Sequence, residues 1–572
     1  MNGRGTRVNA HARPRGATRA VATDARRRVA VVVAASALLA TEAHAQARLT
    51  RTEDAAPVPR GFARLRVIPS WSRFETHFAG SSGDGASTAP LASAIVAESL
   101  GVVQIPGLAS AEEALRTLTG DPAFRLSLGR SMATAAARVV TTAFIAEYGL
   151  TRRLTVGGVL PVVQSRTELV VSLNADDDAT ANVGPSPGRI SETGRRPADQ
   201  LQQQLGSARA TLQSQLDACD QNPSADPSCP TILANRDDVV SLIAETAAFG
   251  SALAVLFGTS TASAQPFVAL NGTAAATDIS NHLSAIRNRL RAYVGSAADQ
   301  IVASVPVAVG PAGFGDLRQL LLGGEFGMAP DSLGAVYRLN VGDIELGAKF
   351  LAFERGNWAG TAGAPSPWMR TRLSLQAIVR LGTGTPTLPR LPHRYLEYGT
   401  GDGQTDVEGA ALLDLGLGRR IVVAAAARYT AQLGAVDAGR VPDETGVVSP
   451  FTPLHEGTRR LGDVLVGELT PRVLIGRYFG ADAHYAIIVR GDDEYSSADG
   501  GAPLRRGGFT EQRVGVGITY STLRGARGRP PRIPVEVSAA RIETIAGSSG
   551  AVPQAWRNQI ELRLYYSPWR RR

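Results

Sequence analysis

Charged side chains in this chain recur at every second position within short apolar stretches. Glu345 and Lys349 alternate with apolar residues in one stretch, and Arg372 and Arg380 do so in another. A period of two is that of a β-strand, in which successive side chains point to opposite faces. Lipid cannot solvate charge, so these patterns predict a membrane barrel with an apolar outer face and a charged lumen. The residues predicted to line the lumen are Glu345, Lys349, Arg372, Arg380, Glu408, Asp414, Arg428, Glu468, Arg472, His484, Arg490 and Arg513.

Three basic residues of this set indicate what the lumen could accept. Arg372 and Arg380 share one strand face, and Lys349 lies on the preceding predicted strand. Positive charges that lie close together raise the local concentration of anions. The sequence therefore predicts a preference for anions, or for polar aromatic molecules that carry a carboxylate.

Motifs for catalysis, cofactors and metals are weak in this sequence. His484 falls on a predicted lumen face near Arg490 and Asp492, but a lone lumen histidine is more often a polar lining residue than a general base. The Gly-rich runs 382–384 and 399–403 lack the Lys-Ser/Thr sequel of a phosphate loop. We therefore expect no enzyme activity, no cofactor and no metal.

Twelve stretches are long enough for a tilted membrane crossing of about 9–11 residues. Two kinds of connection alternate between these stretches. One kind is mostly a short turn, as at Thr151 and Gly418, and the other is a long polar loop. This asymmetry is typical of an antiparallel transmembrane β-barrel with short periplasmic turns, and an even strand count places both termini in the periplasm. The predicted strands are 63–78, 138–149, 153–173, 342–354, 369–383, 405–417, 420–433, 463–477, 480–492, 508–522, 533–544 and 556–567.

The chain divides into four predicted segments. Residues 1–45 have the basic, apolar and small-x-small regions of a Sec signal peptide, with cleavage after Ala45. Residues 46–173 hold the first barrel strands and the first external loop, 174–340 form an insert, and 341–572 supply the remaining strands. This organisation predicts export to the outer membrane of a Gram-negative bacterium.

The insert has helical rather than strand-like periodicity. Asp237 and Asp278 are placed to cap helices over 239–257 and 279–302. A further helix is predicted by the apolar stripe Leu201, Leu205, Leu212 and Leu216. Strand parity puts the insert on the external side, where it would either cap the barrel or fold back into the pore as a plug. The fold class is therefore an antiparallel transmembrane β-barrel of about twelve strands, with an α-helical insert in one long external loop.

The chain has two cysteines, Cys219 and Cys229, and both lie in the insert. They bracket a turn-forming run rich in Asp, Pro and Ser. Exported proteins form and keep disulfides, so we expect this pair to be bonded.

Charge and aromatic residues indicate the partners of the chain. The net charge of +9 comes almost wholly from arginines spread along the sequence, which argues against a nucleic-acid patch. Aromatic residues near strand ends are suited to the two interfaces of a lipid bilayer. The last strand ends on Tyr566 and resembles the signal read by the barrel-assembly machinery. The expected partners are outer-membrane lipid, that machinery and a small-molecule solute, with no nucleic acid.

Five segments together resemble a known family. Residues 147–156 and 160–163 are similar to its "YGLT-[DR]-RL … LP" signature, and 342–350 to its "GDI-x-LG-x-K" strand. Residues 381–384 and 399–407 look like its following strand and Gly-rich loop. The family is that of the outer-membrane channels of the meta-pathway phenol-degradation-like type, distantly allied to the fatty-acid transport barrels.

The resemblance implies passive uptake of small solutes, aromatic or apolar ones included. It covers the strands on either side of the insert, roughly 139–173 and 342–433. Two other functions stay open from the residues alone. One is an outer-membrane barrel enzyme of the lipase or protease type. The other is a structural or adhesive barrel whose external helical insert binds a partner.

Overall fold

The computed structural model describes most of the chain beyond the predicted signal peptide. It covers residues 39–40 and 53–567, except 80–86, 176–179, 260–262, 324–325, 330, 332, 359–367, 387–394, 435, 445, 498–501 and 524–533. Within the predicted signal peptide only β1 (Leu39–Ala40) is described, and it pairs with Gly508.

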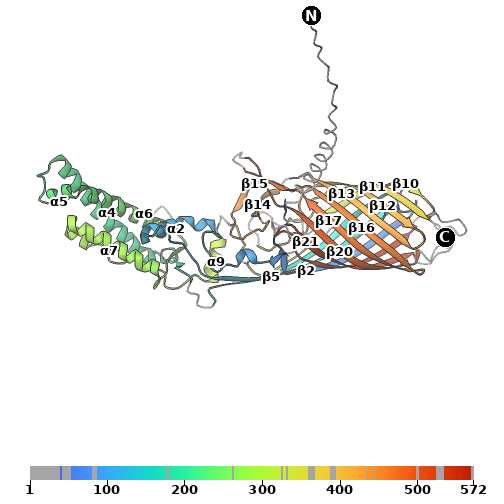
Figure 1. Cartoon of the computed structure of the whole chain (residues 1–572), viewed down its shortest axis with the longest axis horizontal. Helices are drawn as coiled ribbons and strands as arrows, with labels where there is room; N and C mark the ends of the chain where they lie inside the picture. Colours follow the sequence, from blue (N-terminus) through green and yellow to red (C-terminus); the bar gives the residue numbers. More distant parts are fainter. Residues whose placement is uncertain are drawn as a thin grey trace, which may run out of the picture.

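Twelve antiparallel strands close into a β-barrel, which confirms the predicted fold class (Figure 1). Each strand pairs with the next around the ring, and the last strand, β22, pairs with the first, β2. Two other strands of the same sheet, β1 and β9, lie off the ring. The strands are β2 (Ala63–Phe74), β5 (Ser131–Gly149), β6 (Leu154–Leu173), β10 (Ile344–Arg355), β11 (Met369–Leu381), β12 (Asp406–Leu417), β13 (Ile421–Gln432), β16 (Val464–Ile475), β17 (Phe479–Arg490), β20 (Gly508–Ser521), β21 (Val535–Gly547) and β22 (Trp556–Tyr566).

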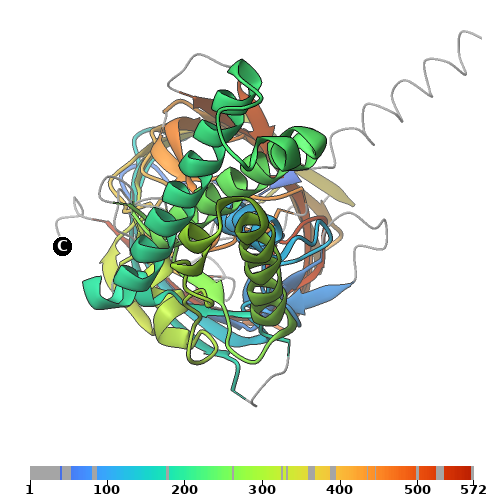
Figure 2. The same ribbon diagram turned by 90° about the vertical axis from the view of Figure 1, so that its left-hand side faces the viewer.

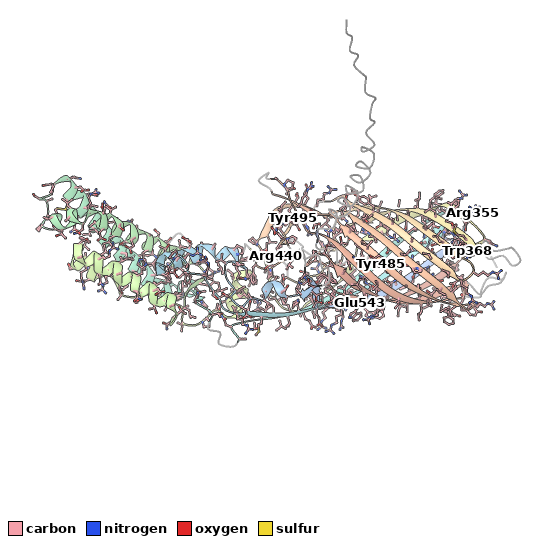
Figure 3. All side chains as sticks on the ribbon, in the orientation of Figure 1. Arg355, Trp368, Arg440, Tyr485, Tyr495 and Glu543 are labelled. Atoms are coloured by element: carbon pink, nitrogen blue, oxygen red, sulfur yellow. A yellow bond between two sulfur atoms is a disulfide. The ribbon has the colours of Figure 1, made fainter. Side chains whose placement is uncertain are left out.

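The outer wall of the barrel is apolar because the strands alternate as the sequence predicted. On β12, Asp406 and Glu408 are buried, whereas Val407 between them is exposed. A monomeric soluble protein rarely exposes so many large apolar side chains, but a bilayer requires them. Figure 3 shows the exposed Trp368 at one end of the barrel and Tyr485 on the outer wall between the ends.

Tight turns gather at one end of the barrel, which we call the turn end. In the β5–β6 turn, the Thr151 hydroxyl accepts hydrogen bonds from the N–H groups of Arg153 and Leu154, at 3.1 and 2.9 Å. Gly418 and Gly476 supply the positive φ angles, 56° and 64°, of two further turns, a conformation that costs glycine little. The opposite end carries the longest connections, and we call it the loop end. The turn end also has two longer connections, β10–β11 and β20–β21.

A helical extension projects from the loop end and does not fill the lumen (Figures 1 and 2). Strands β5 and β6 run past the barrel into it and pair there from Ser131↔Leu173 onward, so β5 begins earlier than the predicted residue 138. The helices of the extension are α2 (Ala109–Thr119), α4 (Glu192–Gln221), α5 (Cys229–Ala234), α6 (Arg236–Phe257) and α7 (Ala274–Val294).

The core of this extension is built from two separate parts of the chain. Helix α2 comes from the loop between β2 and β5, and it packs against α6 and α7 of the insert. Leu115 and Leu118 join the same buried cluster as Leu205 and Leu253. Helix α6 is also long and apolar enough, by length and composition, to cross a membrane. Its packing against α2 and α4 makes it a central helix of the extension.

The predicted helix caps are wrong by a few residues. Asn235, not Asp237, precedes α6, and Thr273, not Asp278, caps α7 by accepting a hydrogen bond from the Ala276 N–H. The shorter elements lie in the loops: β3 (Thr76–Phe78), β4 (Thr88–Pro90), β7 (Val183–Pro185), β8 (Phe267–Ala269), β9 (Val336–Val341), β14 (Val436–Arg440), β15 (Leu454–Arg460), β18 (Asp493–Ser497), β19 (Leu504–Arg506), α3 (Pro187–Ile190), α8 (Ser296–Asp299), α9 (Phe314–Leu321), and the 3-10 turns Ser93–Ile95 and Pro106–Leu108.

The predicted disulfide is present in the extension. Cys219 near the end of α4 is bonded to Cys229 at the start of α5, with a Cα–Cα distance of 5.2 Å. Both residues are fully buried beside Leu216 and Ile232. The bond therefore fixes the tip of the longest helix to the next helix.

Breaking this disulfide is expected to loosen the extension and leave the barrel intact. Closing a loop of this length is worth roughly 3 kcal/mol in the chain-entropy model. The variant Cys219→Ser/Cys229→Ser should be cut by trypsin in residues 192–257 much faster than the parent chain. The barrel fragment should resist trypsin equally in both proteins. Equal cleavage rates in 192–257 would show that packing alone holds the tip.

Candidate functional site: a charged cavity in the barrel lumen

A cavity of about 160 Å³ lies inside the barrel. Its wall includes six of the residues predicted to face the lumen: Glu345, Lys349, Arg380, Glu408, Arg428 and Glu468. They come from β10, β11, β12, β13 and β16, which are neighbours in the ring. One side of the cavity is therefore a charged surface spread over adjacent strands.

The other six predicted residues lie outside the lining of this cavity. Arg372 bonds Glu354 at 2.8 Å, and Asp414 accepts a hydrogen bond from the Ala55 N–H at 3.1 Å. Arg472 lies 3.6 Å from Asp482. The last three are paired as well: His484 with Thr470, Arg490 with Asp493 and Arg513 with Glu511.

The part of the cavity wall next to this charged surface is more apolar. Ile145, Val159, Pro161 and Val163 contribute to it from β5 and β6. Ile145 and Val163 are buried, although the same two strands also place Thr141, Glu147 and Thr155 in the cavity wall. The cavity can thus hold a small molecule with its carbon skeleton against the apolar part of the wall and its polar groups against the charged part.

The ion pairs of the structure argue against the anion preference expected from the sequence, because each of its three bases is paired with a carboxylate. Lys349 bonds Glu53 at 2.6 Å, Arg380 bonds Glu345 at 2.9 Å, and Arg372 bonds Glu354. The lining as a whole holds more acids than bases: Glu53, Glu147, Asp343, Glu345, Glu408 and Glu468 against Arg66, Lys349, Arg380 and Arg428. Strand alternation showed which side the bases face but not which carboxylates neighbour them.

Residues 53–58 enter the lumen, where Glu53 forms part of the cavity wall; we call them the N-terminal segment. Ala55 and Val58 are fully buried. The Ala55 carbonyl accepts a hydrogen bond from the Ser374 hydroxyl at 2.6 Å, and the Val58 N–H donates to the Thr155 hydroxyl at 2.9 Å. Backbone groups of this segment are therefore satisfied by side chains of the barrel wall.

Ion pairs hold the two acids of the N-terminal segment. Glu53 faces Lys349 at 2.6 Å and Arg64 at 3.6 Å, and Asp54 faces Arg563 at 3.2 Å. Burial alone would raise the pKa of Glu53, but Lys349, Arg66 and Arg64 hold that pKa well below its usual range. Both acids therefore stay charged at neutral pH and tie the segment to the wall.

Sequence reasoning missed several charges of this network. Arg64 and Arg66 alternate with apolar residues on β2, and Glu561 and Arg563 do so on β22. The period-two signal that identified the other lumen residues was present at these four positions. No such signal marks Glu53, because the N-terminal segment is not a strand.

The structure also pairs a serine with a histidine in the loop after β2, where the sequence indicated no such pair. Ser93 Oγ lies 3.0 Å from His77 Nε2, while His77 Nδ1 faces the carbonyl of Phe78 at 3.2 Å. Burial lowers the pKa of His77. Neither residue lines the lumen cavity, and the pair packs β3 within the loop after β2.

Solved structures that align with most of this chain are barrels of bacterial outer membranes. An outer membrane channel from Pseudomonas putida F1 is 9% identical, with a TM-score of 0.37 over 90% of this chain and 100% of that chain. A Pseudomonas aeruginosa FadL homologue is 8% identical, with a TM-score of 0.26 over 93% and 99%. The Pseudomonas putida toluene transporter TodX is 10% identical, with a TM-score of 0.21 over 93% and 96%. No protein-family model and no curated protein matches this sequence.

Proposed function

We propose that the chain is an outer-membrane channel through which small solutes enter passively, aromatic and apolar ones included. The observation that carries the proposal is the cavity inside a closed barrel with an apolar outer wall. Its wall, which is partly charged and partly apolar, suits a small amphipathic molecule. In this proposal the turn end faces the periplasm and the extension faces outward.

Narrowing the cavity is expected to reduce solute entry. Val466 lines the cavity, and its neighbour Leu465 points to lipid with 51% exposure. In proteoliposomes, Val466→Trp should slow the uptake of a small aromatic solute such as indole several-fold, because the larger ring occupies the path. Leu465→Trp adds the same ring on the outer face and should leave uptake unchanged.

Two results would contradict the channel. Liposomes that contain the parent protein could take up indole no faster than empty ones. Val466→Trp and Leu465→Trp could also have equal effects, which would mean that solute does not pass the cavity. Hydrolysis of lipid or peptide by the intact barrel, lost on His484→Ala, would favour the enzyme instead.

A further inference from the structure

Three carboxylates contact the guanidinium of Arg380 where the cavity approaches the loop end, and two more lie in the loops before β10 and β12. Arg380 donates to Glu345 and Asp406, both at 2.9 Å, and lies 3.6 Å from Glu408. Asp343, in the loop between β9 and β10, accepts a hydrogen bond from the Asp402 N–H at 3.0 Å. We call these five acids the acidic group.

Three of the five acids come from one stretch of chain. From 402 to 408 the even-numbered positions are buried and the odd-numbered ones exposed. Asp406 and Glu408 on β12 therefore face inward, and Asp402 and Gln404 are buried in the loop that precedes this strand. Arg428 also reaches Glu408, at 3.3 Å, but it is shared with Glu468 at 3.5 Å. The acids outnumber the bases, and carboxylates crowded in a poorly solvated site repel one another.

Two buried polar side chains at this end have no protein partner in the described part of the chain. Gln404 is 2% exposed, and neither its amide oxygen nor its amide nitrogen is hydrogen-bonded. Thr141, 3% exposed, lines the cavity with its hydroxyl equally unpartnered. Buried polar groups are normally satisfied, so such atoms indicate a place where another molecule supplies the partner.

We propose that this end of the cavity is a subsite for a cationic group of the solute, an ammonium that donates N–H bonds. An ammonium offers donors and no acceptor, which matches the carboxylates of Glu345 and Glu408 and the hydroxyl oxygen of Thr141 in the cavity wall. The apolar part of the wall formed by Ile145, Val159 and Val163 then receives the hydrocarbon part of the same molecule. This inference rests on the proposed channel and names the class of solute: small apolar or aromatic amines.

The protonation of Asp343 gives the subsite a dependence on pH. Burial raises the pKa of Asp343 to about 7, and the charge of Asp402 acts in the same direction. Arg380 and the N–H groups of Gly384 and Asp402 act against this shift. A proton on Asp343 competes with a bound cation, so affinity for an ammonium should rise as the pH increases from 6 to 8.

The test compares two probes of similar shape and opposite charge, benzylammonium and benzoate. Isothermal titration calorimetry on the full refolded chain measures binding whether or not the channel conducts. Benzylammonium should bind more tightly than benzoate, and more tightly at pH 8 than at pH 6. Glu345→Gln and Glu408→Gln should each weaken it by roughly ten-fold or more, because a hydrogen bond to a charged group is lost.

A matched control removes a carboxylate away from the lumen. Glu168 lies on the extended part of β6 and is exposed, so Glu168→Gln should bind benzylammonium as the parent chain does. Glu408 is buried, and if its variant misfolds, the half-buried Glu345 and the neutral change Thr141→Val still test the subsite. Benzoate binding as tightly as benzylammonium, or unchanged affinity in Glu345→Gln and Thr141→Val, would overturn the subsite. A chain that binds benzylammonium but takes up no solute would overturn the channel instead.

Discussion

Deleting residues 53–58 is expected to raise the single-channel conductance of the barrel several-fold. The N-terminal segment occupies the lumen, and it is held by the Ser374 and Thr155 hydroxyls and by ion pairs to Lys349 and Arg563. Removing it takes away the backbone and side chains that fill this part of the lumen. Planar-bilayer recording of the parent and the deletion variant measures the effect directly.

A milder variant separates the ion pairs from the bulk of the segment. Glu53→Gln/Asp54→Asn keeps the backbone but removes its charges, so brief openings should become more frequent. The control Glu168→Gln/Asp217→Asn removes two carboxylates from exposed positions and should record as the parent does. Identical conductance in the deletion variant and the parent would show that the segment does not obstruct the path.

The same ion pairs predict how the closed state responds to acid. Arg and Lys neighbours hold the pKa values of Glu53 and Asp54 below their usual range, against the effect of burial. An acid whose pKa is lowered when the N-terminal segment is in place stabilises that placement at pH values above the ordinary pKa of the acid. This contribution is lost as the pH falls below the ordinary pKa toward the lowered one. Lowering the pH from 7 to 5 should therefore leave the segment in place.

The barrel could be predicted from the sequence because each strand carries its own evidence. Alternation on β10 and β12 places Glu345 and Glu408 on the inner face whatever the neighbouring strand is. Lipid on one side and a polar lumen on the other make this local pattern obligatory. The tight turns at Thr151 and Gly418 could be located because each lies directly between two alternating stretches.

The electrostatics of the site could not be predicted because they depend on contacts between distant segments. Lys349 bonds Glu53, nearly three hundred residues earlier in the chain, and nothing near either residue encodes that pairing. The carboxylates around Arg380 likewise come from β10 and β12, which flank its own strand, β11. A one-dimensional pattern fixes the face of a side chain, and the register of the closed sheet fixes its partners.

The extension was only partly predictable for the same reason. Helices α4, α6 and α7 have their own apolar stripes, so the sequence indicated them. Helix α2 is eleven residues long, and its apolar face is buried only when it packs against α6 and α7. A short amphipathic helix of this kind is stabilised by tertiary packing more than by its own propensity.

Arginine on the outer face of the barrel is expected to destabilise it according to its depth in the bilayer. Val516 lies in the central part of β20 and is 66% exposed, whereas Ile475 ends β16 at the turn end and is 57% exposed. A lipid-facing arginine costs about 2–4 kcal/mol at the midplane and about 0–1 kcal/mol near the interface. Val516→Arg should therefore lower the free energy of unfolding far more than Ile475→Arg. Urea unfolding of the barrel in lipid vesicles measures the free energy of unfolding of both variants. Because the two side chains are similarly exposed in the protein itself, only a surrounding bilayer distinguishes them, and equal losses would place β20 outside the hydrocarbon region.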